Sequence, residues 1–264
     1  MTDPPVHRFA GRDGLELAWR ETGHGRPLVL LHGLMGSGAQ LLGSELASGL
    51  AASGHRVILP DLRGHGDSGR ASDAVWYPPD VLADDGLALI DQLGLDDYDL
   101  GGYSLGGKLV LRLLARGARP ARAFVAGQGL DAIDAESNRT GGHRGLLAAM
   151  ADGADFEPGS QEATMAAWIR QIGADPRAIG HVLSTFVATP ADALRRVQVP
   201  TLVVVGDRDP RGATAAELAA LLPEGRLVTV PGDHGTALVA PELTAAVAEF
   251  LGLDATGGRR PPPR

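Results

Sequence analysis

Gly102-Tyr103-Ser104-Leu105-Gly106 stands between a short apolar run and a helical pattern. A chain that turns this sharply from strand to helix needs neighbours almost without side chains, which explains a glycine two positions before and two positions after Ser104. The serine hydroxyl is then exposed at a helix start, where the helix dipole and the free N–H of Leu105 stabilise negative charge. The pentapeptide therefore predicts an activated serine in a nucleophile elbow.

The residues on either side of this turn supply the context that the motif requires. Upstream, Tyr98 to Gly101 form the end of a predicted strand. Downstream, apolar residues recur at helical spacing: Leu105, Leu109, Val110, Leu113 and Leu114. Strand, turn and helix thus follow one another in the order that exposes a nucleophile.

The composition indicates one large α/β domain with a core of its own. The chain has 264 residues, of which 44% are hydrophobic and 21% charged, so a sizeable core forms without disulfides or metals. The absence of cysteine excludes disulfides, thiol nucleophiles and cysteine-ligated zinc.

The net charge and the absence of a signal or membrane span indicate which kinds of partner the protein has. A formal net charge of -8 argues against nucleic acid and anionic membranes as partners, which select basic surfaces. Residues 1–8 show no secretory signal, and no apolar run reaches the roughly 18 residues of a membrane span. We therefore expect a soluble cytoplasmic protein, with a disordered tail at 256–264 and an oligomeric state that the sequence leaves open.

Alternating apolar runs and helical patterns predict a mostly parallel sheet with helices on both faces. A hairpin at His7 to Ala10 and Leu15 to Trp19 is expected at one sheet edge. The remaining predicted strands lie at Leu28 to Leu31, Val57 to Leu59, Ala123 to Ala126, Leu202 to Val205 and Leu227 to Val230. Helices are predicted at Gln40 to Ala52, Asp80 to Leu93, Leu105 to Arg116, Thr214 to Leu222 and Pro241 to Leu251.

The connection between the strands near 127 and 198 is far longer than a crossover between parallel strands needs. Helical patterns at Arg144 to Met150, Glu162 to Ile172 and Arg177 to Phe186 predict a small helical insertion over the carboxyl ends of the strands. Residues 128–197 are thus expected to form a lid over a core made of 1–127 and 198–255; packing helices that leave the site open are the alternative.

An activated serine requires a base and an acid that orients it. Among eight histidines, His234 follows the last predicted strand, where a loop can bring it over the elbow. Asp209 and Asp207 both follow the strand at Leu202 to Val205, and Asp209 is preferred because Asp207 can cap the loop or pair with Arg208. The resulting chain order is Ser104, Asp209, His234.

With these residues the chain resembles a lid-bearing enzyme of the α/β-hydrolase fold superfamily from about Phe9 to Leu253. The elbow and the acid-histidine pair agree with that family, as do His32-Gly33-Leu34 and the segment from Asp61 to Ser68. The resemblance implies that the N–H groups of Leu34 and Leu105 form the oxyanion hole and that His32 braces its loop. The glycines at 64 and 66 favour a supporting loop over a metal site made of Asp61, His65 and Asp67, so no metal and no cofactor are expected.

The preferred reaction is hydrolysis of a carboxylic ester, or a related acyl bond, of a small molecule through an acyl-enzyme. Two alternatives stay open. The stretches Leu31 to Gly38 and Gly102 to Lys108 also resemble the carbon-carbon lyases of menaquinone biosynthesis, although that family usually has arginine where Lys108 stands, and a carbon-carbon hydrolase belongs to the same alternative. The other is a non-catalytic receptor that keeps the triad to hold a small ligand.

Aromatic and apolar residues near the predicted elbow and in the predicted lid are candidates for contact with the substrate. Met35, Tyr103 and Trp168 are predicted to contact it; Trp76, Tyr77, Phe156 and Phe186 are further candidates, and Arg139 and Arg144 could bind a carboxylate. Lys108 is expected to be a solvated helix residue. The sequence does not identify the acyl group.

Overall fold

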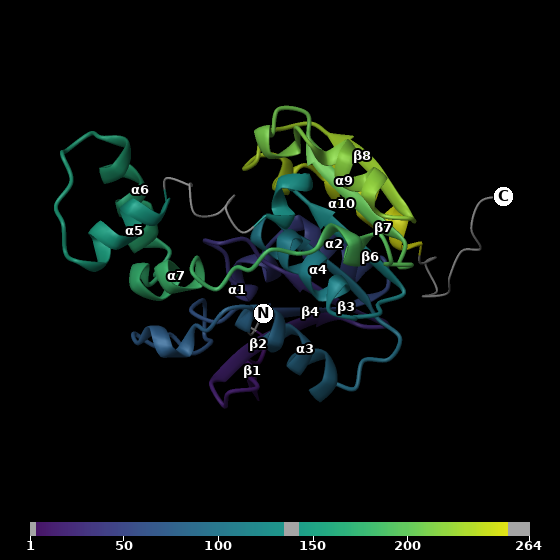
Figure 1. The fold of residues 1–264 in the computed structure, drawn as a ribbon, viewed down its shortest axis with the longest axis horizontal. Helices are drawn as coiled ribbons and strands as arrows, with labels where there is room; N and C mark the ends of the chain where they lie inside the picture. The colour runs from purple at the N-terminus through teal and green to yellow at the C-terminus, as the bar shows by residue number, and fades with distance from the viewer. Residues whose placement is uncertain (1–3, 135–142, 253–264) are drawn as a thin grey trace.

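An eight-stranded sheet forms the centre of the computed structural model, which describes residues 4–134 and 143–252 (Figure 1). The strand order is β1-β2-β4-β3-β5-β6-β7-β8, and only the pairs β1/β2 and β2/β4 are antiparallel. The strands are β1 (His7–Ala10), β2 (Glu16–Gly23), β3 (Arg26–Leu31), β4 (His55–Asp61), β5 (Asp99–Tyr103), β6 (Arg122–Ala126), β7 (Thr201–Gly206) and β8 (Gly225–Val230). The predicted mostly parallel sheet with an edge hairpin is confirmed.

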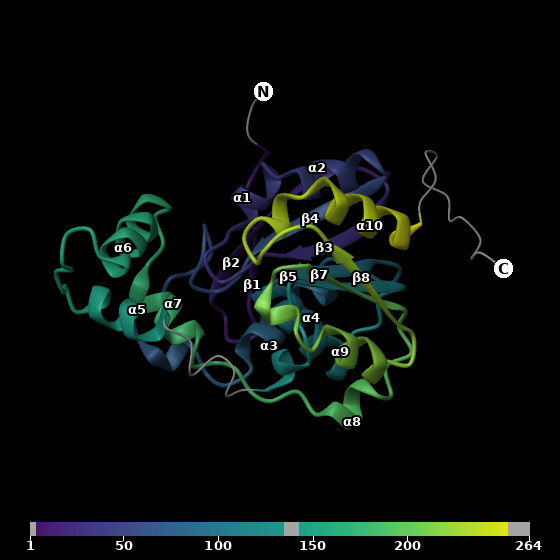
Figure 2. The same ribbon diagram turned by 90° about the horizontal axis from the view of Figure 1, so that it is seen from above.

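Helices cover both faces of this sheet (Figure 2). One face carries α1 (Gly38–Leu42), α2 (Glu45–Ala52) and α10 (Pro241–Leu251); the other carries α3 (Val81–Gln92), α4 (Leu105–Ala115), α8 (Ala191–Leu194) and α9 (Ala215–Leu221). Each face has its own apolar core, and β5 and β7 are buried throughout because both of their faces are covered. The predicted α/β architecture therefore holds along the whole sheet.

The position of Ser104 follows from the strand order. The chain leaves β3 for β4 on one side and then returns to β5 on the other side of β3. In open α/β sheets a ligand crevice forms outside the carboxyl ends of the strands at such a reversal. Ser104 stands directly after the last residue of β5, at the crevice that this reversal creates.

A third group of helices follows β6 and precedes β7 in the sequence. In both views it lies to one side of the sheet (Figures 1 and 2). It consists of α5 (His143–Ala151), α6 (Gln161–Gln171) and α7 (Pro176–Val182). These helices have a small core of their own, made of Leu147, Ile169, Ile179 and Leu183. The long connection thus supplies the helices predicted from its pattern; Arg139 and the tail at 256–264 lie outside the described residues.

Two predicted helices differ from the structure. The helix expected at Gln40 to Ala52 is broken into α1 and α2, because Gly43 ends the first and the Ser44 hydroxyl caps the second by accepting the N–H of Ala47. The helix expected to reach Phe186 ends as α7 at Val182. Beyond it, the carbonyl of Thr185 accepts the N–H of Asp80, which draws the chain back toward the sheet.

Candidate active site

Ser104 has the backbone conformation that the elbow demands. Its φ of 55° and ψ of -112° are strained for a residue with a side chain, and it is the N-cap of α4. The flanking glycines permit this turn: a Cβ on Gly102 would lie 2.3 Å from the carbonyl carbon of Gly106, and a Cβ on Gly106 would lie 2.1 Å from the carbonyl oxygen of Leu31. The serine hydroxyl is consequently held at the amino end of a buried helix.

The structure brings Ser104, His234 and Asp209 into one chain of hydrogen bonds. The Nε2 atom of His234 lies 2.9 Å from the Ser104 hydroxyl, and its Nδ1 atom lies 2.7 Å from Oδ2 of Asp209. The Asp209 side chain is fully buried, whereas that of His234 is 30% exposed. An Nδ1–H that donates to Asp209 leaves the lone pair of Nε2 free to accept the serine proton.

The other acid candidates are engaged elsewhere. Asp207 accepts the N–H of Gly232 at 2.8 Å and lies 3.4 Å from the guanidinium of Arg208, so it ties two loops together. Asp233 accepts the N–H groups of Gly235 and Thr236 within its own turn. Asp209 is thus the acid that the structure pairs with His234.

Tyr103 lines the cavity as predicted, and it also holds His234 in place. Its ring lines the cavity in front of Ser104, yet its hydroxyl donates to the main-chain carbonyl of His234 and is not presented to a ligand. Burial, helped by the carboxylate of Asp209, raises the pKa of this hydroxyl and keeps it a neutral donor. Gly127, with φ at 67°, makes room for the arrangement, because a Cβ there would lie 3.0 Å from the tyrosine ring and 3.2 Å from the imidazole of His234.

Buried imidazoles brace the loop that carries Leu34. His32 accepts the N–H of Leu62 through Nε2 at 3.0 Å, and its Nδ1–H donates to Gly33 O at 2.7 Å. Burial lowers the pKa of His32 to about 3, so this ring is neutral and structural. On the other side of the loop, His65 donates from Nε2 to the carbonyl of Leu34 at 2.5 Å. Leu105 is the first residue of α4, so its N–H has no partner within the helix.

The acidic side chains of the loop from Asp61 to Ser68 are engaged in contacts within the protein. Asp61 accepts the N–H of Gly38 at 2.7 Å and that of Asp67 at 3.0 Å, and Arg20 completes its ion pair at 3.1 Å. Within the part of the chain that the structure describes, no group of three or more histidine, aspartate or glutamate side chains is arranged to hold a metal ion.

Ser104 opens into a cavity of about 830 Å³ between the sheet and the α5–α7 group. This volume lies in the range of sites for drug-sized ligands, and the walls are mainly apolar. The predicted contact residues Met35, Tyr103, Trp168 and Phe186 line it, whereas Trp76, Tyr77 and Phe156 do not. The other lining residues include Leu34, Leu105, Ala132, Met165, Leu183 and Leu238, with the polar residues Lys108, Gln128, Asp131, His143, Arg211 and His234.

The family of the chain emerges from comparison with known proteins. The family described as alpha/beta hydrolase fold matches residues 26–131. A non-heme haloperoxidase from Rhodococcus erythropolis is 31% identical over 270 residues, which cover 90% of this chain and 97% of that protein. The chain belongs to the α/β-hydrolase family.

Solved structures agree with this membership. A hydrolase from Pseudomonas aeruginosa is 25% identical and superposes with a TM-score of 0.71, covering 95% of this chain and 100% of that one. An enol-lactonase from Burkholderia xenovorans is also 25% identical, with a TM-score of 0.69 over 94% of this chain and 99% of that one. The strand order, the elbow and the helices on both faces are those of an α/β-hydrolase enzyme.

The position of Lys108 differs most clearly from its prediction. It was expected in solvent, but it is buried on α4, one turn after Ser104, and it lines the cavity that contains Ser104. Its Nζ donates to Asp134 O at 2.8 Å and lies 5.1 Å from the ring centroid of Phe186. Burial lowers the pKa of Lys108 to about 8 despite the nearby Asp134. Helical periodicity alone could not reveal this, because the covering residues come from the connection after β6.

Arg144 and His143 are adjacent in sequence, but only His143 lines the cavity that contains Ser104. Arg144 donates to the carbonyl of Leu183 at 3.0 Å and to the Ser184 hydroxyl at 3.2 Å, and it does not line the catalytic cavity. His143, in contrast, stands at the start of α5 and lines that cavity. Burial and the nearby Arg211 lower its pKa. A single histidine at the head of a helix gives no sequence signal for such a position.

None of the helices within 4–134 and 143–252 combines the length and the apolar character that crossing a bilayer requires.

Proposed function

We propose that this α/β-hydrolase cleaves a carboxylic ester of a small apolar molecule, with Ser104 as nucleophile, His234 as base and Asp209 as the acid that orients it. The hydrogen-bonded chain from Asp209 through His234 to Ser104 carries this proposal. The name of the enol-lactonase relative supports it, because a lactone is a cyclic ester. The apolar lining of the cavity favours an uncharged acyl group.

In the first half of the reaction the ester is converted into an acyl-enzyme. The Ser104 oxygen attacks the ester carbonyl carbon while its proton passes to Nε2 of His234. The tetrahedral intermediate then collapses, the bond between the carbonyl carbon and the alkoxy oxygen breaks, and the proton on Nε2 goes to the departing alcohol. Asp209 stabilises the transient imidazolium without taking its proton.

In the second half water releases the acid. His234 takes a proton from a water molecule, whose oxygen attacks the acyl carbon and forms a second tetrahedral intermediate. Collapse of this intermediate breaks the bond to the Ser104 oxygen, which regains the proton from Nε2. One water is consumed, and one alcohol and one carboxylic acid are formed.

The N–H groups of Leu34 and Leu105 are assigned to the oxyanion hole. The N–H of Leu105 opens α4, so it adds the positive end of the helix to the hydrogen bond. The Leu34 N–H shares its peptide plane with the carbonyl of Gly33, which accepts hydrogen bonds from Nδ1 of His32 and from the N–H of Gly36, so the orientation of this donor is fixed. Loss of one such donor typically slows an acyl transfer by about 10² to 10³.

Residues 128–197 are assigned the role of a lid. Helices α5, α6 and α7 or the residues that follow them contribute His143, Met165, Trp168, Leu183 and Phe186 to the cavity that contains Ser104. A cover of this kind excludes water from the reacting carbonyl and gives the site its shape. On this assignment the lid residues select the acyl group.

Steady-state kinetics with p-nitrophenyl esters test the proposal. Multiple turnovers by the wild type would separate an enzyme from a ligand receptor, and Ser104→Ala and His234→Ala should each lose at least about 10³-fold in kcat, as expected for groups that act as a unit. Asp209→Asn should lower kcat far more than the matched variant Asp207→Asn. Equal losses in these two would overturn the acid assignment, and turnover of acidic lyase substrates but not of esters would favour the carbon-carbon lyase.

A further inference from the structure

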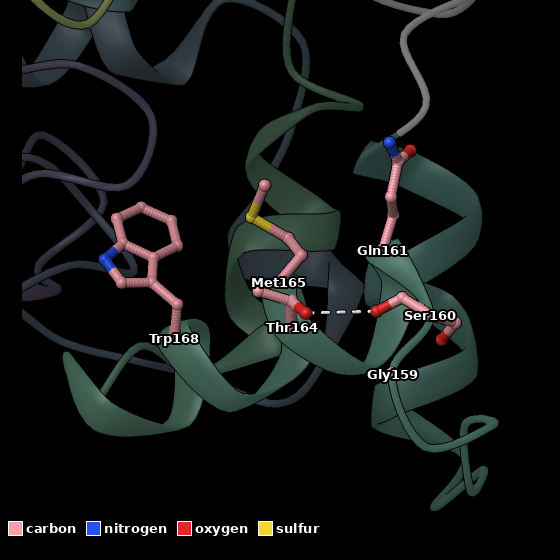
Figure 3. Close-up of a pocket in the computed structure, with 6 residues that line it drawn as sticks. All are labelled: Gly159, Ser160, Gln161, Thr164, Met165 and Trp168. Atoms are coloured by element: carbon pink, nitrogen blue, oxygen red, sulfur yellow. Dashed lines mark hydrogen bonds between the residues drawn. The ribbon is translucent and has the colours of Figure 1, made fainter.

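The lid carries a second hollow outside the catalytic cavity. About 610 Å³ of space lies against α6, lined by Gly159, Ser160, Gln161, Thr164, Met165 and Trp168. Figure 3 shows the side chains of Gln161, Met165 and Trp168 on the same side of the helix, as their spacing of four and three residues dictates. From Gln161 to Trp168 this side extends for about 10 Å along the helix axis. We call this hollow the α6 groove.

Two residues connect the α6 groove with the catalytic cavity. Met165 and Trp168 line both, so the apolar wall that begins beside Ser104 continues onto the outer surface of the lid. The two hollows are therefore neighbours that share the side chains of Met165 and Trp168 as a common wall.

Trp168 lies outside the apolar core of the lid. Its surface is 42% exposed, whereas Ala166 and Ile169 on the same helix are fully buried, and Ile169 belongs to the lid's core. Met165, in contrast, packs against that core while it also lines the α6 groove, so α6 joins the lid's core to the groove. Trp168 is thus a large aromatic side chain that is exposed beside the cavity containing Ser104, where a ligand can reach it.

The chemistry of the α6 groove favours an apolar occupant. Its hydroxyl groups are engaged within the helix start: Ser160 Oγ accepts the N–H of Ala163 at 3.0 Å, and Thr164 Oγ1 donates to the carbonyl of Ser160 at 3.0 Å (Figure 3). Among the described residues that line it, none carries a charge. The thioether of Met165 adapts readily to a flexible ligand.

We propose that the α6 groove binds the distal methylene chain of a long unbranched acyl group whose carbonyl carbon lies at Ser104. This inference rests on the proposed ester hydrolysis and specifies its substrate class. Near the nucleophile the cavity receives the ester group and the first methylenes, and the chain then passes between Met165 and Trp168 onto the face of α6. The continuous apolar wall argues for the substrate, and not a separate partner, as the occupant.

The dependence of kcat/KM on acyl length tests this assignment. Wild-type kcat/KM should rise from p-nitrophenyl acetate through butanoate and octanoate to decanoate, by up to about fourfold for each methylene that becomes buried. In Trp168→Ala the ratio of kcat/KM for decanoate to that for acetate should fall about tenfold, and Trp168→Phe should restore part of it. Trp76→Ala is the matched control: Trp76 is 37% exposed, lines neither hollow and should leave the ratio unchanged.

A binding measurement separates this inference from the proposed reaction. Methyl decanoate should bind Ser104→Ala about tenfold more tightly than Ser104→Ala/Trp168→Ala in a fluorescence titration. If the wild type hydrolyses no ester, the proposed function falls, and this titration still decides the groove. If esters are hydrolysed but Trp168→Ala keeps the wild-type length profile, the groove assignment falls alone. A change in self-association in place of a changed profile would make the groove an interface between copies and also overturn it.

Discussion

Tyr103 and Ser104 are adjacent in sequence, and each contacts a different part of His234. The serine hydroxyl meets Nε2, while the tyrosine hydroxyl donates to the main-chain carbonyl of the same histidine. The ring centroids of Tyr103 and His234 lie 5.4 Å apart, with an angle of 40° between the ring planes. The imidazole of His234, our proposed base, is therefore fixed from β5 itself, so its position does not depend on its own loop alone.

Removal of the Tyr103 hydroxyl should loosen the base without removing it. We expect Tyr103→Phe to lower kcat by about tenfold with KM within about twofold, because misplacement of a catalytic group affects the transition state most. Steady-state kinetics on a short ester measure this split. Tyr98→Phe is the matched control, since Tyr98 is equally buried beside the start of β5 and distant from the site. Similar kcat values for the two variants would contradict the positioning role.

The sequence allowed Ser104, Asp209 and His234 to be selected because each carries a local signal. Ser104 stands between glycines, and the acid and the base follow predicted strands whose carboxyl ends meet at one edge. Tyr103 and Lys108 have no such signal. What they touch comes from the loop after β8 and from the connection after β6, so their roles depend on tertiary packing.

At the scale of elements, the elbow that joins β5 to α4 is packed closely against the main chain of β3. Gly106 lies in the first turn of α4, where β3 passes close to it. A methyl group there would meet the main chain of Leu31, which cannot move without disturbing the sheet. The glycine is thus required by the approach of a helix to a strand.

This packing predicts a large loss of stability on Gly106→Ala. We expect the free energy of unfolding to fall by about 3 kcal/mol, the upper end for overpacking, because the obstacle is backbone. Urea denaturation followed by circular dichroism measures it. The matched variant is Gly145→Ala on α5, where a Cβ meets nothing and a gain of about 0.5 to 1 kcal/mol is expected. Equal stability of both variants would refute this description of the elbow.

Most element types were predictable, and the two misses have different causes. Apolar runs bounded by turn residues identified the buried strands, and Pro241 correctly marked the start of α10. The break between α1 and α2 was missed because Leu41, Leu42 and Leu46 continue the apolar pattern across Gly43. The end of α7 was missed because it depends on a contact between Thr185 and Asp80 that no local pattern contains.

At the scale of the whole molecule, two cores on either side of the sheet support a site that lies at their edge. The α5–α7 group adds a third, smaller core and walls the cavity above Ser104. Lys108 lies where these parts meet, and its burial imposes a cost on the fold while it is charged. The stability of the molecule should therefore depend on the protonation of this one side chain.

The sign of that dependence follows from the lowered pKa. Between about 8 and 10.5 the unfolded chain holds the Lys108 proton and the folded chain does not, so wild-type stability gains with rising pH across this window. The Lys108→Met variant has no amine at this position, so its unfolding free energy lacks this rise with pH. From pH 7 to pH 10 the difference in unfolding free energy should shift by about 2 kcal/mol in favour of the wild type, at about 1.4 kcal/mol per pKa unit. Urea titrations at both pH values measure it, and a constant difference would show that the lysine is not buried in its charged form.

The central claim is that Ser104 is a nucleophile activated by His234. Its most direct measurement is the rate and site of covalent labelling by diethyl p-nitrophenyl phosphate, followed by release of p-nitrophenol and by peptide mass mapping. We predict one adduct per chain, on the peptide that contains Ser104, and a labelling rate at least about 10³-fold lower in His234→Ala, as expected for groups that act as a unit. An adduct on another residue, or rapid labelling of Ser104 in His234→Ala, would contradict the claim.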